Sequence, residues 1–528
     1  MVTVMLASSR ARWWALGALA LAGAVVGLDL TVLNLALPTL ATDLHASAGD
    51  LQWIVDAYSL VLAAILLPAG LLGDRFGRKK LLVAALVLFG AASLACAYAP
   101  SAAALIAART VLGLGAAFII PLSFSILPVL FSERERARAL TILIGMVMLA
   151  YPIGPIVGGW LLTHFWWGSV FLINVPAVVL ALTAVAVFMP ESRASKAPRL
   201  DPAGVVISSI GLAGVTYGAI EAGQKGWGGL TAILPLVAGL FVLAAFILWE
   251  RRAIRRHGEA LLDLSLFRSP SFSWGTALVT MVTFAMFGLI FSMPQYFQGV
   301  VGTDAFGSGL RLLPMIGGLI AGGAAADRVA RAAGAKLTVA LGFAVLAVAL
   351  VMGATTGVAT GYGFAAVWIA MLGVGLGFAM PASMNAALGQ LSKERSGVGS
   401  AVIQATRQVG GTIGVAILGS LMISAYHSHL SVAGLPAAAA RGARESVFGA
   451  VAVARQLGSA QLLDSARHAF VHGMDVMLLA CAGLAALGMV LAVVFLPRRS
   501  RSLEAEDAAR SLQVEARVES PHGLIADK

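Results

Sequence analysis

The sequence predicts an all-α polytopic membrane protein with 14 transmembrane helices and both termini in the cytoplasm. Of its 528 residues, 59% are hydrophobic and only 12% are charged, and the mean hydropathy is +0.91. A soluble chain of this length needs a more polar surface. Apolar runs of about 20 residues, the length that crosses a bilayer as a helix, recur between short polar breaks, and basic residues are concentrated in alternate breaks.

The apolar runs give the positions of the expected spans. The first run is too long for the apolar region of a secretory signal and has no clear cleavage site, so we expect it to remain as a spanning helix. The predicted spans are residues 14–38, 51–71, 81–99, 103–127, 139–162, 169–189, 203–221, 231–249, 272–293, 308–326, 337–356, 363–386, 399–424 and 475–496.

The distribution of charge predicts the orientation. If the N-terminus is cytoplasmic, most Lys and Arg residues fall in cytoplasmic segments, as the positive-inside rule requires. An odd number of spans would break this alternation. The formal charge of +11 follows from the same bias, so it does not indicate nucleic-acid binding. The external segments contain only Lys225, Arg441, Arg444, Arg455 and Arg467.

We expect the spans to be organised as six, two and six. Residues 1–190 would form an N-terminal six-helix half, and residues 191–270 a cytoplasmic linker with two inserted spans. Residues 271–497 would form a C-terminal six-helix half with an external loop at 425–474, where we expect a short amphipathic helix. Residues 498–528 would be a cytoplasmic tail.

A carboxylate, Asp29, lies inside the first apolar run, in the stretch LDLTVLNLALP. Burial at bilayer depth disfavours the anion, so such a group can bind a proton from one side and release it to the other. A lipophilic cation that enters beside Asp29 would favour the ionised form and expel the proton. The alternative is a structural hydrogen bond to a neighbouring span.

A glycine-rich basic turn follows the second span. Its glycines allow a tight turn and close helix approach, and its acid can cap a helix or pair with an arginine. An ordinary basic loop is the alternative. A degraded copy, Gly323 to Arg328, follows the tenth span, as internal repeats would require. The residues of the first copy are Gly70, Asp74, Arg75, Gly77, Arg78 and Lys79.

The fifth span carries small residues and prolines. Gly154 and Gly158 share one helix face, so a neighbouring backbone can approach closely. Pro155 removes a backbone donor and bends the helix, and Gly159 extends the small face. Close helix contact alone would explain this pattern.

These motifs resemble those of a known family. The pattern G-x-x-x-D-R-x-G-R-[KR] at residues 70–79 resembles the signature of the major facilitator superfamily, which implies a gating latch between the second and third spans. The pattern G-P-x-x-G-G at residues 154–159 resembles the signature of its exporters, which implies outward transport. Arg109, with Gly113 and Gly115, resembles the R-x-x-x-G-x-G proton-coupling signature, although Leu112 stands where glutamine is frequent.

The first two spans narrow the resemblance. LDLTVLNLALP and residues 52–58 resemble the 14-span drug–proton antiporters, the EmrB/QacA subfamily. This resemblance implies that Asp29 lines a central cavity. The likeness extends over essentially the whole chain and is strongest at residues 28–160. Arg109, Asp56 and Glu221 join Asp29 as proton-coupling candidates. Arg109 could instead reach the external surface, Asp56 could lie at the external rim, and Glu221 could be an exposed cap.

Aromatic and polar side chains in the spans are candidates for a substrate cavity, since aromatic faces suit cations and planar compounds. Helix packing is the alternative for each of them. We expect two of these residues, Arg311 and Arg407, to pair with an acid or a carbonyl group. The candidates are Asn34, Trp53, Tyr58, Phe291, Met293, Gln295, Tyr296, Phe297, Gln298, Asn385, Arg311 and Arg407.

These expectations favour a proton-coupled antiporter that exports lipophilic cationic or planar aromatic drugs across the bacterial cytoplasmic membrane and gives multidrug resistance. Its partners would be drugs, protons and the bilayer, and we expect a monomer without cofactor or metal. The alternatives are transport of one metabolite or a self-made antibiotic, and a membrane-embedded lipid-modifying enzyme. The sequence contains no phosphate-binding loop of the kind that would indicate an ATPase. Cys96 and Cys481 lie in apolar runs, where we expect inert thiols.

Overall fold

The computed structural model describes residues 9–46, 48–193, 201–257, 264–389, 391 and 396–497, and this part of the chain is helical without any strand. Ten of its helices precede residue 258: α1 (Ser9–Asp43), α2 (Ala48–Phe76), α3 (Arg78–Ala97), α4 (Ala102–Ser125), α5 (Leu127–Leu130), α6 (Glu133–His164), α7 (Ser169–Leu172), α8 (Asn174–Phe188), α9 (Pro202–Lys225) and α10 (Leu230–His257).

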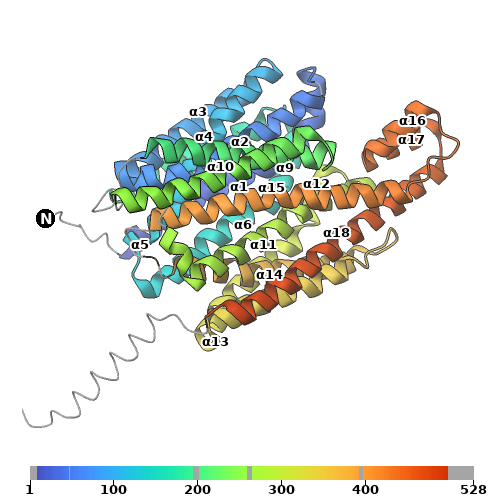
Figure 1. The fold of residues 1–528 in the computed structure, drawn as a ribbon. Coiled ribbons are helices and arrows are strands. Elements are labelled where there is room, and N and C mark those ends of the chain that lie inside the picture. Colours follow the sequence, from blue (N-terminus) through green and yellow to red (C-terminus); the bar gives the residue numbers. More distant parts are fainter. Residues whose placement is uncertain are drawn as a thin grey trace, which may run out of the picture.

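The rest of the described chain is helical as well (Figure 1). It comprises the 3₁₀ helix η1 (Leu264–Arg268), α11 (Pro270–Gln295), the π-helical turn η2 (Tyr296–Val300), α12 (Ala305–Leu310), α13 (Leu313–Gly353), α14 (Tyr362–Leu388), α15 (Ser396–His429), α16 (Ala437–Glu445), α17 (Val447–Leu457) and α18 (Ala460–Phe495).

Thirteen helical segments of the described chain are long and apolar enough to cross a membrane, which confirms the predicted all-α polytopic class. One of these segments contains α13, in which Gly334 has φ 83° and ψ 164° and separates two helices. A continuous helix of 41 residues would be about 62 Å long, twice the hydrocarbon thickness of about 30 Å. The two parts correspond to the predicted spans 308–326 and 337–356.

The two arms of α13 run in opposite directions along α14. In the first arm, residues with higher numbers in α13 contact residues with higher numbers in α14, so these two helices run parallel. In the second arm the order is reversed and the helices run antiparallel, so the chain turns back at Gly334. The number of crossings, 14, and the cytoplasmic location of both termini stay predictions. The contacts are Gly318 with Ala370 and Gly322 with Val374 in the first arm, and Gly342 with Ala379 and Leu346 with Gly375 in the second.

Helix contacts divide the bundle into two groups with a pair between them. Helices α1, α2, α3, α4, α6 and α8 pack together, as do α11, α13, α14, α15 and α18. Helices α9 and α10 pack on each other, and α9 also contacts α2 and α15, one from each group. The boundaries of the predicted units at 190, 270 and 497 stay predictions.

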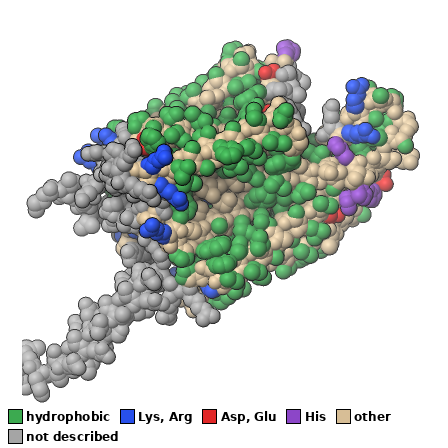
Figure 2. All heavy atoms as spheres, in the orientation of Figure 1, with side chains coloured by type: hydrophobic (Ala, Val, Ile, Leu, Met, Phe, Trp, Pro, Cys, Tyr) green, Lys and Arg blue, Asp and Glu red, His purple; other side chains and the backbone are tan. Residues whose placement is uncertain are grey.

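The exterior is apolar along the sides of the helices (Figure 2). Large side chains such as Phe241, Leu234 and Val187 are 72%, 69% and 68% exposed. Water would disfavour so much apolar surface, whereas lipid accepts it. Lys and Arg gather instead at the ends of the bundle, many of them at the end where the described chain begins.

The predicted external loop 425–474 is more ordered than expected. In place of one short helix it contains α16, α17, the end of α15 and the first four turns of α18. The hydroxyl of Tyr426 donates to the carbonyl oxygen of Ala443 at 2.8 Å and fixes α16 against α15. The predicted tail, 498–528, lies outside the described residues.

Candidate functional site

A buried ion pair joins α1 to α4. Arg109 Nη1 lies 2.5 Å from Asp29 Oδ2, and the two side chains are only 1% and 2% exposed. The two residues are 80 positions apart in the sequence. The structure therefore brings together two of the proton-coupling candidates. Arg109 faces Asp29 and does not reach the external surface.

Three further groups surround the pair. Asn174, at the start of α8, donates from Nδ2 to Asp29 Oδ1 at 3.0 Å, and Arg109 Nε donates to the carbonyl oxygen of Ile54 at 3.1 Å. The guanidinium also lies 4.3 Å from the ring centroid of Tyr58, a cation–π contact. Among the described residues, the Tyr58 hydroxyl and Asn174 Oδ1 have no hydrogen-bond partner. This cluster is polar, enclosed and incompletely satisfied.

The Asp29 carboxylate faces Arg109 and Asn174 inside the contact between α1, α4 and α8. A carboxylate at bilayer depth is stabilised by a buried guanidinium and by hydrogen bonds to its oxygens. Asp29 does not line the cavity of about 1140 Å³ between α9, α10 and α15, and its expected place on the wall of a central cavity stays a prediction.

The glycine-rich basic turn joins α2 to α3. Asp74 Oδ1 pairs with Arg78 at 2.8 Å, and both side chains are buried. Gly77 has φ 111°, a conformation that side chains disfavour, and this allows α3 to start immediately after α2. Lys79 Nζ donates to the carbonyl oxygen of Ala186 at 2.7 Å, and Arg75 lies 5.7 Å from the ring of Phe76.

This turn also meets the second group of helices. The backbone amide of Val398, in the first turn of α15, faces the Asp74 carboxylate. Gly70 is buried one turn earlier in α2. Nearby, Ser400 Oγ of α15 donates to the carbonyl oxygen of Pro121 in α4 at 3.1 Å. The turn thus lies where the two groups touch, as a latch would require.

The glycines of α6 pack directly on α1, which confirms the expected close approach. A Cβ added to Gly154 would collide with Thr31 Oγ1, and one added to Gly158 would lie 3.0 Å from a methyl carbon of Val32. Pro155 and Gly159 are buried in the same helix. A Cβ on Gly154 would also lie 3.4 Å from the carbonyl oxygen of Leu28, so α6 packs on the part of α1 that carries Asp29.

Gly154→Ala tests this contact. Overpacking costs about 1–3 kcal/mol, so we expect lower thermal stability in detergent and weaker transport. Gly145→Ala in the same helix is the matched control, since a Cβ there meets nothing within 4 Å. Adding Thr31→Ala to Gly154→Ala removes the clashing oxygen and should restore most of the loss. Equal behaviour of the Gly154 and Gly145 variants would contradict the assigned contact.

The remaining acidic candidates lie elsewhere. Glu221 is only 4% exposed, so it is not an exposed cap. It belongs to α9. Just after the end of this helix, Trp227 Nε1 donates to Ser420 Oγ of α15 at 3.2 Å. Asp56 is half-buried in α2.

The predicted cavity residues are dispersed. Trp53 is 40% exposed and stacks on Tyr217 of α9 at 6.1 Å. Arg311 donates to the carbonyl oxygen of Gly307 at 3.3 Å, and a carbonyl group is one of the two kinds of partner expected for it. The Tyr296 hydroxyl donates to the carbonyl oxygen of Gly357 at 3.3 Å. Met293 and Phe297 are buried, whereas Gln295, Gln298 and Asn385 are half-buried. The side chains of Asn34 and Phe291 lie outside the described residues.

Arg407 occupies a buried position in α15. It donates from Nε to Thr283 Oγ1 at 3.2 Å and from Nη1 to Gln404 Oε1 at 2.6 Å. The ring of Tyr151, from α6, approaches that of Phe287, from α11, at 5.7 Å, which is a contact between the two groups of helices. Of the expected partners, an acid or a carbonyl group, Arg407 thus meets the amide carbonyl oxygen of Gln404, together with the hydroxyl of Thr283.

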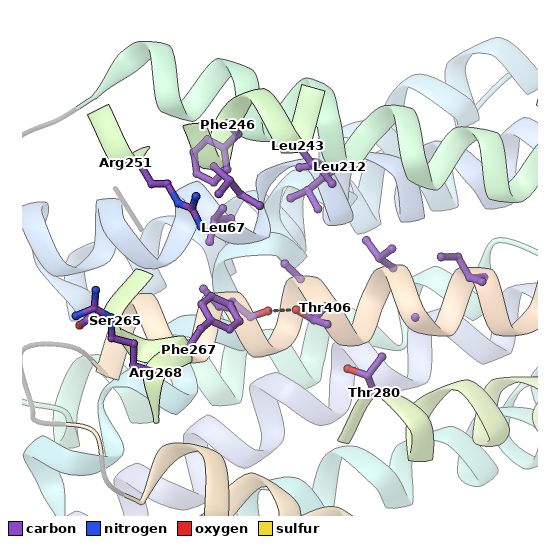
Figure 3. Close-up of a pocket in the computed structure, with 16 residues that line it drawn as sticks. Leu67, Leu212, Leu243, Phe246, Arg251, Ser265, Phe267, Arg268, Thr280 and Thr406 are labelled. Carbon is purple, nitrogen blue, oxygen red and sulfur yellow. Dashed lines mark hydrogen bonds between the residues drawn. The ribbon is translucent and has the colours of Figure 1, made fainter. Parts of the chain in front are cut away.

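The cavity that the structure does show was not predicted. It has a volume of about 1140 Å³ and lies between α9, α10, α2, η1, α11 and α15 (Figure 3). None of the predicted cavity residues lines it. Sequence reasoning also missed Asn174, although an asparagine inside an apolar run is the same kind of signal as Asp29. Among the described residues, no group of three or more metal-ligating side chains occurs.

Comparison with known proteins identifies the family. Residues 19–415 match the Major Facilitator Superfamily. The chain is 35% identical over 413 residues to a tetracenomycin C resistance and export protein of Streptomyces glaucescens, covering 78% of this chain and 76% of that protein. It is 34% identical to the multidrug efflux pump LfrA of Mycolicibacterium smegmatis, covering 88% and 92% of the two chains. It is also 34% identical to the methyl viologen resistance protein SmvA of Salmonella typhimurium, covering 92% and 99%.

Solved structures agree with the fold. A bacterial homologue of the human lysosomal transporter Spinster, inward-facing and unoccupied, superposes with a TM-score of 0.58 at 16% identity, covering 93% of this chain and 99% of that one. The human organic anion transporter MFSD10 gives the same TM-score at 14% identity, covering 91% and 99%. From the family match, these relatives and its many apolar helices, the chain belongs to the major facilitator superfamily and is a multi-pass protein of a bacterial cell membrane.

Proposed function

We propose that this chain exports drugs or antibiotics from the cell in exchange for protons, as a member of the 14-span antiporters with both termini cytoplasmic. The relatives named above are resistance and efflux proteins. The observation that carries the coupling proposal is the buried Asp29–Arg109 pair. An ionisable pair enclosed at bilayer depth is costly, and such residues commonly belong to proton pathways.

Proton binding to Asp29 would break this pair. The neutral acid no longer attracts the guanidinium, and Arg109 is left buried against the Ile54 carbonyl oxygen and the Tyr58 ring. Removing one partner of a buried pair costs about 3–5 kcal/mol, enough to favour another arrangement of α1 and α4. The proton thereby selects between two conformations.

The route to the second group of helices would run through α6. Helix α1 packs on Gly154 of α6, and Tyr151 of α6 contacts Phe287 of α11. A shift of α1 would move α6 and the contact between the groups. Drug and proton would then compete through this rearrangement without sharing one surface.

The latch and the exporter motif would set the direction. The contact of Asp74 with α15 would hold the cytoplasmic side closed in one state and release it in the other. Substrates would be lipophilic. The buried charge of Arg407, which interacts electrostatically with Tyr151, favours planar aromatic compounds over cations at that point.

Efflux from inverted membrane vesicles tests the proposal. With an imposed pH gradient, planar aromatic and cationic dyes should accumulate in vesicles that contain the protein. One pH unit supplies about 1.4 kcal/mol per proton, about a tenfold concentration ratio, and 100 mV adds about 2.3 kcal/mol. A protonophore should dissipate the accumulation. Accumulation that resists the protonophore would contradict proton coupling.

A further inference from the structure

We propose that the cavity between the inserted helices and the two groups binds an anionic phospholipid of the leaflet on the side of the Asp74–Arg78 turn. The cavity has a volume of about 1140 Å³, larger than the roughly 300–1,000 Å³ of ordinary small-molecule pockets. It lies outside the Asp29 cluster, and this proposal does not depend on proton-coupled export.

The wall of the cavity is apolar over the depth of one leaflet. On α10, Leu243, Phe246 and Ile247 lie on one face that ends at Arg251. From Leu243 to Arg251 the helix rises by about 12 Å. On α15 the lining runs from Val402 to Ile413, about 16 Å. Half of a hydrocarbon core is about 15 Å, so the wall matches one acyl layer.

Charge is confined to one end of this wall. Arg251 and Arg268 line the cavity where α10 ends and η1 lies, and Figure 3 shows both at that end with the apolar side chains further along. Both guanidinium groups are exposed. Within the described chain neither makes a hydrogen bond or ion pair, so both can bind an anion.

The position of this end relative to the membrane fits a headgroup. Leu67 of α2 lines the cavity one turn before the latch, and Val402 lines it one turn after Val398, which faces Asp74. The two arginines thus lie on the basic side of the bundle, where the headgroups of the adjacent leaflet are found. Basic pockets between transmembrane helices on that side bind anionic headgroups. An anion with an apolar body of leaflet length is a phospholipid.

The inserted helices make this site. Arg251, Phe246 and Leu243 belong to α10, and Leu212 belongs to α9. Helix α9 contacts both α2 and α15. A lipid bound here would therefore fill the space between the inserted helices, α9 and α10, and the place where α2 of one group meets α15 of the other.

Native mass spectrometry of the purified full-length protein tests the site. The protein is titrated with phosphatidylglycerol and phosphatidylcholine that carry the same palmitoyl and oleoyl chains. We expect bound phosphatidylglycerol to dominate in the wild type. In Arg251→Gln/Arg268→Gln this preference should fall about 25-fold, because each basic group contributes about fivefold. Arg252→Gln, an exposed neighbour that does not line the cavity, should keep the preference.

A second variant tests the acyl part of the site. Ala405→Phe projects into the apolar cavity and should reduce bound phosphatidylglycerol while both arginines stay in place. Three results would overturn the proposal: equal binding of the two lipids by the wild type, an unchanged preference in the double arginine variant, or binding of inorganic phosphate that displaces the lipid. Displacement of the lipid by a transported dye would identify the cavity as a drug site and would overturn it as well.

Discussion

Asp29→Asn is expected to abolish drug efflux driven by a pH gradient. Asparagine has nearly the same shape and keeps an acceptor oxygen for Arg109, but it cannot ionise. The variant should therefore fold and bind drug, and it should still exchange drug for drug across the membrane. Accumulation in inverted vesicles should fall to the level of membranes without the protein, whatever the external pH.

Asp464→Asn is the control for this experiment. Asp464 is an exposed carboxylate on α18, 71% accessible, which interacts with His468 at 3.4 Å. Loss of this charge should leave efflux unchanged. If Asp29→Asn pumped as well as the wild type with the same pH dependence, the coupling role assigned to Asp29 would fail.

Arg109→Met should destabilise the protein strongly. Methionine fills a similar volume but leaves the Asp29 carboxylate buried without its counter-ion, and such losses are about 3–5 kcal/mol. Unfolding of the purified protein in detergent measures this. Transport should be lost together with stability.

The double variant Asp29→Asn/Arg109→Met separates the pair from its surroundings. With both charges removed, no buried ion is left alone, so the double variant should be more stable than Arg109→Met. Its transport should remain absent, because nothing in the cluster can exchange a proton. A double variant as unstable as the sum of the two single variants would show that the residues do not interact.

Hydropathy was sufficient to predict the class of fold and the position of nearly every long helix. The break at Gly334 was predicted as a loop between two spans, because Arg328, Arg331 and Lys336 interrupt the apolar run. The helices at 437–457 were underestimated, because short helices outside a membrane depend on contacts such as that of Tyr426 with Ala443.

The members of the candidate site could be predicted better than its geometry. Asp29 and Arg109 are conspicuous as charges in apolar runs, but their pairing depends on how α1 and α4 rotate about their axes. An all-round apolar span has no amphipathic pattern that would indicate this rotation. The contact of Asn174 with Asp29 depends on the rotation of α8 in the same way, since its neighbours Val175 and Pro176 do not indicate which side chain it meets.

The cavity was beyond reach of sequence reasoning for a related reason. Its lining residues, such as Leu243, Phe246 and Val409, are ordinary apolar side chains. They form a wall only because α9 and α10 lie beside α2 and α15. Aromatic residue type pointed to Trp53 and Tyr296, and these pack in separate places.

Proton release on drug binding tests the central claim most directly. A transported dye is added to the purified protein in weakly buffered detergent solution, and a pH indicator records released protons. The wild type should acidify the solution when the dye binds, and Asp29→Asn should bind the dye without this acidification. Equal release from both proteins would show that the exchanged proton does not reside on Asp29.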